Sequence, residues 1–430
     1  MDAEGLKLAV IGGGWSGLAA ALRATEAGHR VTLFEMAHQW GGRARSVDVE
    51  GLVLDNGQHI LIGAYVRTLA LMATVGADAS AGLHRQPLEL RYPDGRGLRM
   101  PAGPGWLGFA AAVAGCVGWG WRDRAALLRA AAGWALRGFT CPPTATVAEL
   151  CHTLPLAVRQ LLIDPLCVAA LNTPAQDASA TVFLRVLRDA LFGGRGSADL
   201  LLPRRPLGAL LPEPAVTWLQ SHGATLRPGV RVAQLLRSGK GWHVDGDHQD
   251  AVLLACSAAE AARLAQAHAP AWAACAKAIN YEPIVTVYLR CAGARLPCPM
   301  TVLVDGPEAP AQFVFDHGAL GGVAGVFAFV VSGARAWVDR GLDATGQAVL
   351  QQARRAFATD TWPTPPTLLR AMAEKRATFR CTPGLRRPWA ALSPGLVAAG
   401  DYIAGPYPAT LEGAVRSAEV AVRLLAPGAS

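Results

Sequence analysis

The chain lacks the patterns that mark several common classes of protein. Its nine cysteines are odd in number and include no Cys-x-x-Cys pair, so the sequence predicts neither a disulfide framework nor a metal site. Charged residues make up only 17% of the chain, and no run of lysine and arginine is interleaved with aromatic residues. Nucleic acid is therefore not expected as a partner, although the formal net charge is +8.

Two further absences concern export and membranes. The first residues contain no basic segment followed by a long apolar one, so no signal peptide is predicted. The apolar stretch 106–121 has 16 residues, whereas a membrane-spanning helix needs roughly 20. The 430 residues are nevertheless 52% apolar. We expect a cytoplasmic protein of two intertwined domains, with reduced thiols and peripheral contact with the inner face of the cytoplasmic membrane.

The start of the chain carries a dinucleotide-binding pattern. An apolar run at 8–11 leads into Gly12-Gly13-Gly14-Trp15-Ser16-Gly17, a helical pattern to about residue 27 and a second apolar run at 31–34. In such a pattern Gly12 allows the tight turn, Gly14 lets a pyrophosphate approach the backbone, and Gly17 lets the helix pack on the strand. The helix N-terminus, which includes Trp15 and Ser16, offers free N–H groups to the phosphates.

An acid and a second glycine pair extend this pattern. Glu35 ends the second apolar run, 18 residues after Gly17, where a carboxylate can accept hydrogen bonds from ribose hydroxyls. Gly41-Gly42-Arg43 then suggests a second backbone approach and a guanidinium on the phosphates. The combination resembles the flavin-containing amine oxidase and phytoene desaturase superfamily. The resemblance implies FAD as cofactor and an α/β fold with a Rossmann-like FAD-binding domain and a mixed sheet-and-helix substrate domain.

The C-terminal part of the chain carries a second pattern that suits a flavin. The apolar run 395–399 predicts a strand that ends at Gly400-Asp401, and a helix begins at Thr410-Leu411. An acid at the strand end can bind the ribityl or phosphate region of a flavin, and a helix N-terminus stabilises the negative charge of the reduced ring. This pattern resembles the second flavin motif of the superfamily. We therefore expect the two ends of the chain to form one cofactor site.

A polar segment, Asp55 to His59, follows a predicted hairpin at 47–54. The resemblance implies that this segment passes beside the flavin ring, which makes Gly57 and Gln58 candidate cofactor neighbours. His59 is a candidate proton donor or flavin neighbour. The alternative is a packed histidine without a catalytic role.

The middle of the chain predicts the remaining domains. A short strand is expected at 229–232, and the resemblance implies that Val232 holds the adenine through its backbone. Strands at 284–289, 300–304, 312–315 and 323–331, with a helix at 345–357, predict an antiparallel sheet backed by helices. Asp316-His317 is predicted to be a surface turn. The expected FAD-binding domain comprises 1–80, 195–265 and 385–430, and the substrate domain comprises 81–194 and 266–384.

Residues 101–140 combine tryptophan, apolar residues and arginine. In a helical pattern that runs to about residue 139, Arg122, Arg129 and Arg137 fall on one face, and Leu127 and Trp134 fall on the other. Tryptophan and arginine at the margin of an apolar stretch suit a bilayer interface. The alternative is a pair of buried helices in the substrate domain.

Four segments carry a narrower resemblance: 55–72, 166–191, 199–215 and 407–415. They resemble the hydroxysqualene dehydroxylases of bacterial hopanoid synthesis, also called squalene-associated FAD-dependent desaturases. The resemblance implies an oxidoreductase that reduces hydroxysqualene, a hydrophobic C30 isoprenoid, to squalene with reduced flavin. A carotenoid-type polyene desaturase or isomerase and a non-catalytic prenyl-lipid carrier remain as alternatives. No second Gly-x-Gly-x-x-Gly with a following acid is present, so no dedicated nicotinamide domain is expected. An electron donor or reductase is expected as a partner, and NAD(P)H, a ferredoxin or a partner reductase could each reduce the flavin.

Overall fold

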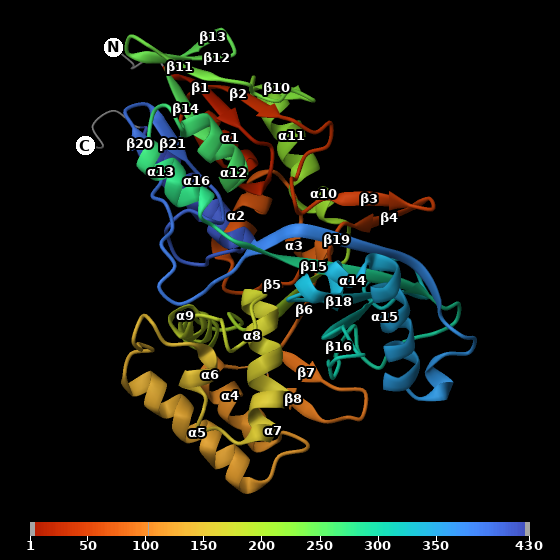
Figure 1. Ribbon diagram of the computed structural model, residues 1–430. Coiled ribbons are helices and arrows are strands. Elements are labelled where there is room, and N and C mark those ends of the chain that lie inside the picture. Colours follow the sequence, from red (N-terminus) through yellow and green to blue (C-terminus); the bar gives the residue numbers. More distant parts are fainter. Residues whose placement is uncertain (1–4, 102, 426–430) are drawn as a thin grey trace.

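The N-terminal apolar run forms the centre of a six-stranded sheet (Figure 1). The structure is a computed structural model that describes residues 5–101 and 103–425. The order across this sheet is β10 (Thr225–Pro228), β2 (Arg30–Glu35), β1 (Lys7–Ile11), β14 (Ala251–Leu254), β21 (Leu396–Ala398) and β20 (Ala391–Ser393). The first five strands are parallel and β20 is antiparallel. Leu8 to Val10 are fully buried, because both faces of a central parallel strand are covered.

Helices and a small sheet cover the two faces. On one face, α1 (Trp15–Glu26) packs against α16 (Leu411–Arg423) and α11 (Pro212–Ser221). The other face packs against α12 (Ala258–Ala265), α13 (Pro270–Lys277) and a three-stranded sheet of β11 (Leu235–Ser238), β12 (Gly241–Val244) and β13 (Asp247–Gln249). The strands of this region come from three separate stretches of the chain, as expected for a site built from both ends.

A second large sheet has five antiparallel strands, in the order β16 (Met300–Val302), β17 (Phe313–Asp316), β18 (Val326–Val331), β15 (Tyr281–Arg290) and β19 (Thr367–Phe379). Helices α14 (Arg335–Arg340) and α15 (Leu342–Ala356) cover one face with the cluster that contains Phe327 and Phe329. The alternate residues on the strands, such as Phe313 and Phe315, belong to the larger core that continues into the rest of the molecule.

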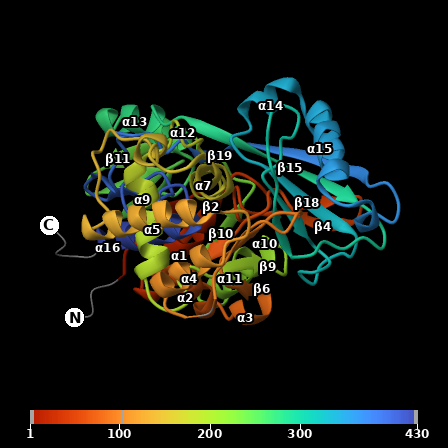
Figure 2. The ribbon, with the colours of Figure 1, turned by 90° about the horizontal axis from the view of Figure 1, so that it is seen from below.

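The helical group lies below the first sheet in Figure 1. It comprises α4 (Gly105–Ala114), α5 (Trp121–Leu136), α6 (Val147–Leu150), α7 (Leu156–Val158), the π-helical turn η1 (Arg159–Ile163), α8 (Asp164–Leu171) and α9 (Ala180–Phe192). Figure 2 shows α5 across the outer side of this group, apart from α14 and α15. Among the helices formed by residues 5–101 and 103–425, none is long and apolar enough to cross a membrane.

Short elements connect these layers. They are the hairpin β3 (Ser46–Val49) and β4 (Leu52–Asp55), the sheet β5 (Leu61–Ile62), β9 (Leu200–Pro203) and β6 (Leu83–Gln86), the hairpin β7 (Glu89–Arg91) and β8 (Gly97–Arg99), and the helices α2 (Val66–Thr74), α3 (Ala79–Gly82) and α10 (Leu207–Leu210). The predicted α/β fold is confirmed, as are the hairpin at 47–54 and the antiparallel sheet backed by helices.

The predicted strand at 229–232 is wrong. The chain turns at Gly229, where φ is +75°, and Val230 N–H then donates to the carbonyl oxygen of Glu35. Side chains bind the backbone groups that follow: the Asp245 carboxylate accepts from the N–H groups of residues 233 and 234, and Arg263 donates to the carbonyl oxygens of residues 232 and 233. Because these backbone groups are already bound, no strand ladder forms and the segment is a loop.

Candidate functional site

A cavity of about 540 Å³ lies between the six-stranded sheet, the five-stranded sheet and α8. Its volume is within the usual range for a cofactor or ligand site. Apart from Gly17, every residue predicted to bind cofactor or to catalyse lines this cavity, namely Gly12, Gly14, Trp15, Ser16, Glu35, Gly42, Arg43, Gly57, Gln58, His59, Val232, Gly400, Asp401, Thr410 and Leu411. The structure thus brings the N-terminal and C-terminal motifs to one place.

The three motif glycines differ in what surrounds them. A Cβ at Gly12 would lie 2.7 Å from the carbonyl of Ala255, and the φ of Gly12 is +113°. A Cβ at Gly17 would lie 1.7 Å from the carbonyl oxygen of Gly12, so the role of Gly17 is close packing of α1 on the turn rather than contact with a ligand. A Cβ at Gly14 would meet only Gly42, at 3.9 Å. The space beside Gly14 therefore belongs to the cavity.

The N-terminus of α1 is built to receive an anion. No side chain caps this helix, and its first turn contains no acidic residue. Ser16 is buried, and its Oγ has no hydrogen-bond partner within the protein. A buried hydroxyl without a partner is uncommon in a folded protein. The hydroxyl and the free N–H groups of the first turn fit the phosphates of a dinucleotide.

Glu35 is fixed at the end of β2. Its two carboxylate oxygens accept hydrogen bonds from Gly13 N–H at 2.6 Å and Ala37 N–H at 2.8 Å. A carboxylate has roughly four acceptor positions, so two bonds leave others free. The side chain lines the cavity, as does Val232.

An ion pair joins the two ends of the chain. Arg43 Nη2 lies 2.6 Å from Asp401 Oδ1, and Arg43 Nη1 donates to the carbonyl oxygens of Arg376 and Ala377 on β19. Burial, the largest single effect, would lower the pKa of Arg43, but the charge and hydrogen bond of Asp401, together with the charges of Tyr281 and Glu374, raise the pKa above its ordinary value. Arg43 therefore stays charged, and it links the glycine pair, the end of β21 and the five-stranded sheet.

The N-terminus of α16 opens onto the same cavity. Thr410 is the N-cap, and its Oγ1 accepts from Gly413 N–H at 3.0 Å. Gly400 N–H donates to Ser417 Oγ at 2.8 Å, which fixes the end of β21 against α16. Thr410 and Leu411 line the cavity, so the positive end of the helix dipole faces its interior.

His59 lies where a flavin neighbour is expected, but its ring is already engaged. Nδ1 is 2.7 Å from the carbonyl oxygen of Gly57, which can only accept, so Nδ1 carries a hydrogen. Burial lowers the pKa of His59, and the charge of Arg43 lowers it further, against the effect of the Gly57 bond. In the neutral ring Nε2 is therefore an acceptor.

One wall of the cavity is apolar. It is formed by Val168, Ala169 and Ala170 on α8 and by Ile284, Phe313, Phe315 and Val330 on the five-stranded sheet. None of these residues was predicted from the sequence to line the site. The alternation along 312–315 signalled a strand, but only the pairing of β17 with β18 shows that Phe313 and Val330 share one face. The site therefore combines a polar dinucleotide cradle with an apolar chamber.

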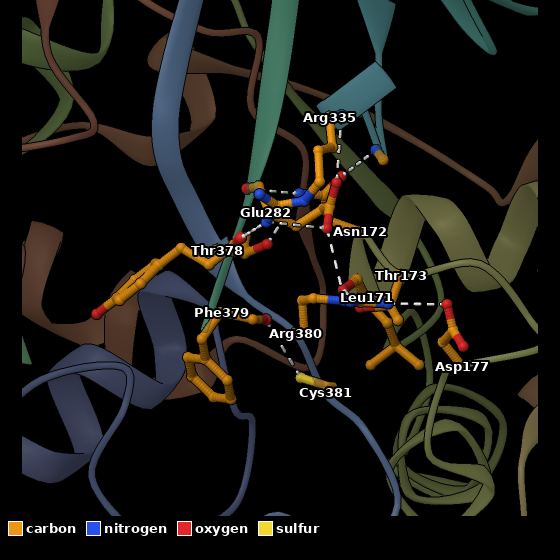
Figure 3. A network of polar contacts seen from close by, with 12 residues as sticks. Leu171, Asn172, Thr173, Asp177, Glu282, Arg335, Thr378, Phe379, Arg380 and Cys381 are labelled. Atoms are coloured by element: carbon orange, nitrogen blue, oxygen red, sulfur yellow. Dashed lines mark hydrogen bonds and ion pairs between the residues drawn. The ribbon is translucent and has the colours of Figure 1, made fainter. Parts of the chain in front are cut away.

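A polar network holds α8 against the five-stranded sheet beside this chamber (Figure 3). Asn172, at φ +46°, ends α8, and its Nδ2 donates to Thr378 Oγ1 at 2.9 Å and to the carbonyl oxygen of Glu282. Its Oδ1 accepts from Gly333 N–H at 2.7 Å. Arg380 extends the network, because it pairs with Asp177 and with the buried carboxylate of Glu282.

Asp316 and His317 are packed on the five-stranded sheet. Asp316 is buried and accepts from the N–H groups of Leu296 and Ala319, so the predicted surface turn at Asp316-His317 is wrong. The turn is instead packed onto the sheet: the His317 ring lies edge to face with Tyr288, and burial lowers the pKa of His317 to about 4. Neither Asp316 nor His317 lines the cavity.

The glycine turn, the acid at the end of β2 and the two helix N-termini facing one cavity define a flavin dinucleotide-binding protein. A family model described as flavin containing amine oxidoreductase matches residues 15–426. The chain belongs to this family, and it is an FAD-dependent oxidoreductase.

Within this family, individual proteins differ in how much of the chain they match. A hydroxysqualene dehydroxylase of Rhodopseudomonas palustris is 30% identical and aligns over 97% of both chains. A zeta-carotene desaturase of Zea mays is 39% identical, but over only 17% of this chain and 13% of its own. Among solved structures, an oxidoreductase from Methanosarcina mazei has the same fold, with a TM-score of 0.75 at 16% identity over 97% of this chain and 100% of its own.

Proposed function

We propose that the protein reduces hydroxysqualene to squalene and water with the two electrons of reduced FAD, which becomes oxidised FAD. One observation supports this most strongly: the alignment with a hydroxysqualene dehydroxylase runs the full length of both chains and therefore includes the chamber as well as the cradle. The apolar wall formed by α8, β15, β17 and β18 suits a C30 hydrocarbon.

In this proposal the cradle residues hold FAD. The first turn of α1, with Gly14 and Ser16, binds the pyrophosphate, and Glu35 binds the adenosine ribose. Gly42, Arg43 and Asp401 hold the phosphate and ribityl region, while Gly57, Gln58 and the N-terminus of α16 border the ring. Bound reduced flavin supplies the hydride that replaces the hydroxyl group.

We assign the substrate hydroxyl to the neighbourhood of His59. Because Nδ1 is bound to Gly57, Nε2 is the ring atom that can meet the hydroxyl, and it can donate a proton only in the positively charged ring. Burial lowers the pKa of His59 below its ordinary 6.5. If His59 is the acid, turnover should therefore rise as the pH falls below 6.5, because more of the ring is then protonated. Unchanged turnover of His59→Ala at full flavin loading would remove His59 from this role.

The decisive experiment is anaerobic incubation of the protein with chemically reduced FAD and hydroxysqualene, followed by product identification by mass spectrometry. Squalene is the expected product. A parallel incubation of the oxidised protein with phytoene tests the carotenoid-type alternative: a desaturase predicts a product with fewer hydrogens, and an isomerase predicts an isomer of the same mass. A colourless protein that cannot be loaded with FAD would instead favour a prenyl-lipid carrier. A reductase or other electron donor is required for repeated turnover.

We also propose that α4 and α5 form a peripheral contact with the cytoplasmic membrane. Exposed apolar side chains gather on this pair, and Trp121 and Leu136 are 74% and 89% exposed. Arg122, Arg129 and Arg137 are exposed on the same helix, whereas Leu127 and Trp134 are buried in the core. Exposed apolar residues beside basic ones are typical of proteins that lie on anionic lipid.

Cosedimentation with vesicles that contain anionic phospholipid tests this contact. The double variant Trp121→Glu with Leu136→Glu is expected to bind about tenfold less, because it replaces the most exposed apolar groups with repelled charge. Trp389→Glu is the matched control, since Trp389 is equally exposed at 74% but lies outside the helical group. Equal binding by all three proteins would contradict the proposal.

A further inference from the structure

The loop before α16 contains a strained tyrosine that the cofactor motif does not explain. Tyr407 has φ +59°, a left-handed conformation that bulky residues rarely adopt. It also precedes Pro408, and a residue before proline is ordinarily extended. Backbone strain of this kind persists only where the surroundings hold it, and it gathers at functional sites.

The Tyr407 side chain is held from several sides. Two guanidinium groups lie over its ring: that of Arg416 on α16, 4.9 Å from the ring centroid, and that of Arg185 on α9, at 5.9 Å. Tyr65, which lines the cavity, meets the ring edge to face at 6.0 Å. The hydroxyl interacts with the carboxylate of Asp189, which also pairs with Arg185. The ring is buried, at 9% exposure, so it joins α9 to the start of α16.

The Tyr407 backbone acts on the same helix end. Its carbonyl oxygen accepts from Thr410 Oγ1 at 2.8 Å, and the same hydroxyl caps α16 through Gly413 N–H. A Cβ at Gly413 would lie 2.0 Å from the Tyr407 carbonyl oxygen, so this oxygen is in close contact with the first turn. The left-handed conformation of Tyr407 thus allows its carbonyl to reach the N-cap while its ring reaches α9.

We propose that Tyr407 is a positioning residue. It fastens the loop before α16 to α9 and so holds Thr410, Leu411 and the positive end of the α16 dipole against the flavin. The inference rests on FAD binding in the cavity and not on the identity of the substrate. Its test therefore needs no substrate, and it can fail while the proposed reaction stands.

The test compares Tyr407→Gly with Tyr407→Phe in the full-length protein. Glycine relieves the strained conformation but removes the ring, whereas phenylalanine keeps the ring and loses only the hydroxyl. FAD affinity is measured by titrating apo-protein and following flavin fluorescence, and the reduction potential of the bound flavin is measured by anaerobic photoreduction against a reference dye. Glu50→Gly is the matched control, because Glu50 also has a positive φ, +53°, but lies in the exposed turn of the β3–β4 hairpin.

We expect Tyr407→Gly to raise the Kd for FAD at least tenfold and to lower the reduction potential, because the helix dipole no longer stabilises the reduced ring. Tyr407→Phe should stay within about threefold of the parent Kd, and Glu50→Gly should match the parent. Should Tyr407→Gly fail to fold, Arg185→Ala removes the α9 side of the contact and is expected to shift Kd and potential in the same directions. A folded Tyr407→Gly, or a folded Arg185→Ala, with the parent Kd and potential would overturn the proposal.

Discussion

The substitution Gly14→Ala is expected to weaken FAD binding while leaving the stability of the apo-protein almost unchanged. The φ of Gly14 is −74°, which alanine adopts freely, and the added methyl group would meet no protein atom closer than 3.9 Å. Because alanine is a poorer N-cap than glycine, we expect the apo-protein to lose under about 1 kcal/mol. The methyl group would instead occupy the space assigned to the pyrophosphate.

The loss of affinity can be worked out from two contributions. Forcing a methyl group into an occupied site costs about 1–3 kcal/mol, and weakening one hydrogen bond to a charged group costs about 1.5–3 kcal/mol. Because the ligand can shift to relieve part of the overlap, we take about 2–4 kcal/mol in total. That corresponds to a Kd for FAD roughly 30 to 700 times that of the parent.

Two measurements check this prediction: the Tm of the apo-protein by circular dichroism, and the Kd for FAD by flavin fluorescence. The parent and Gly14→Ala apo-proteins should melt within about 3 °C of each other. Gly17→Ala is the contrasting variant, because its Cβ would lie 1.7 Å from the Gly12 carbonyl oxygen and must destabilise the apo-protein itself. If Gly14→Ala bound FAD as tightly as the parent, the pyrophosphate would not lie at this turn.

Three further predictions concern the surrounding structure. Asp401→Asn removes the carboxylate that pairs with Arg43 at 2.6 Å and should cost about 1–3 kcal/mol of FAD binding, measured by the same titration. Burial raises the pKa of Asp55 to about 7, so the contribution of Asp55 to the free energy of unfolding is complete below about pH 4 and is lost as pH rises through 7. In denaturant unfolding, the free energy of unfolding of Asp55→Asn should therefore depend less on pH between about 4 and 7 than that of the parent. Asn172→Ala leaves Gly333 N–H without its partner at a buried junction and should cost about 2–4 kcal/mol in urea unfolding, whereas a loss below 0.5 kcal/mol would contradict the role assigned to the network.

The elements that the sequence predicted well are those with local signals. The turn at Gly12 to Gly17, the acid at the end of β2 and the capped start of α16 each depend on residues within one short stretch. We predicted that these motifs meet in one cavity because each resembles a motif for a different part of the same ligand. The Arg43–Asp401 pair shows that the two ends of the chain touch.

The features that the sequence analysis missed depend on distant partners. β19, at 367–379, is the longest strand that the described residues form, yet its sequence mixes charged and apolar residues, because one of its neighbours is β15 and its other side is an edge. Asn172 reads as a helix end, and only the structure shows its bonds to Thr378 and Gly333. The error at 229–232 arose because distant groups bind the backbone that a strand would have paired: Val230 N–H donates to the Glu35 carbonyl oxygen, and Arg263 donates to the Val232 carbonyl oxygen.

The strand order of the six-stranded sheet has a consequence for how the protein is made. β1 lies next to β14, and β14 lies next to β21, which is encoded almost 400 residues after β1. A growing chain on the ribosome can therefore assemble the first turn early but cannot close the pocket until residues 396–423 have emerged. Until then the apolar edge of β14 is exposed and can aggregate unless a chaperone binds it. A chain that is truncated before residue 396 should therefore stay bound to chaperones, and added flavin should not restore its folding.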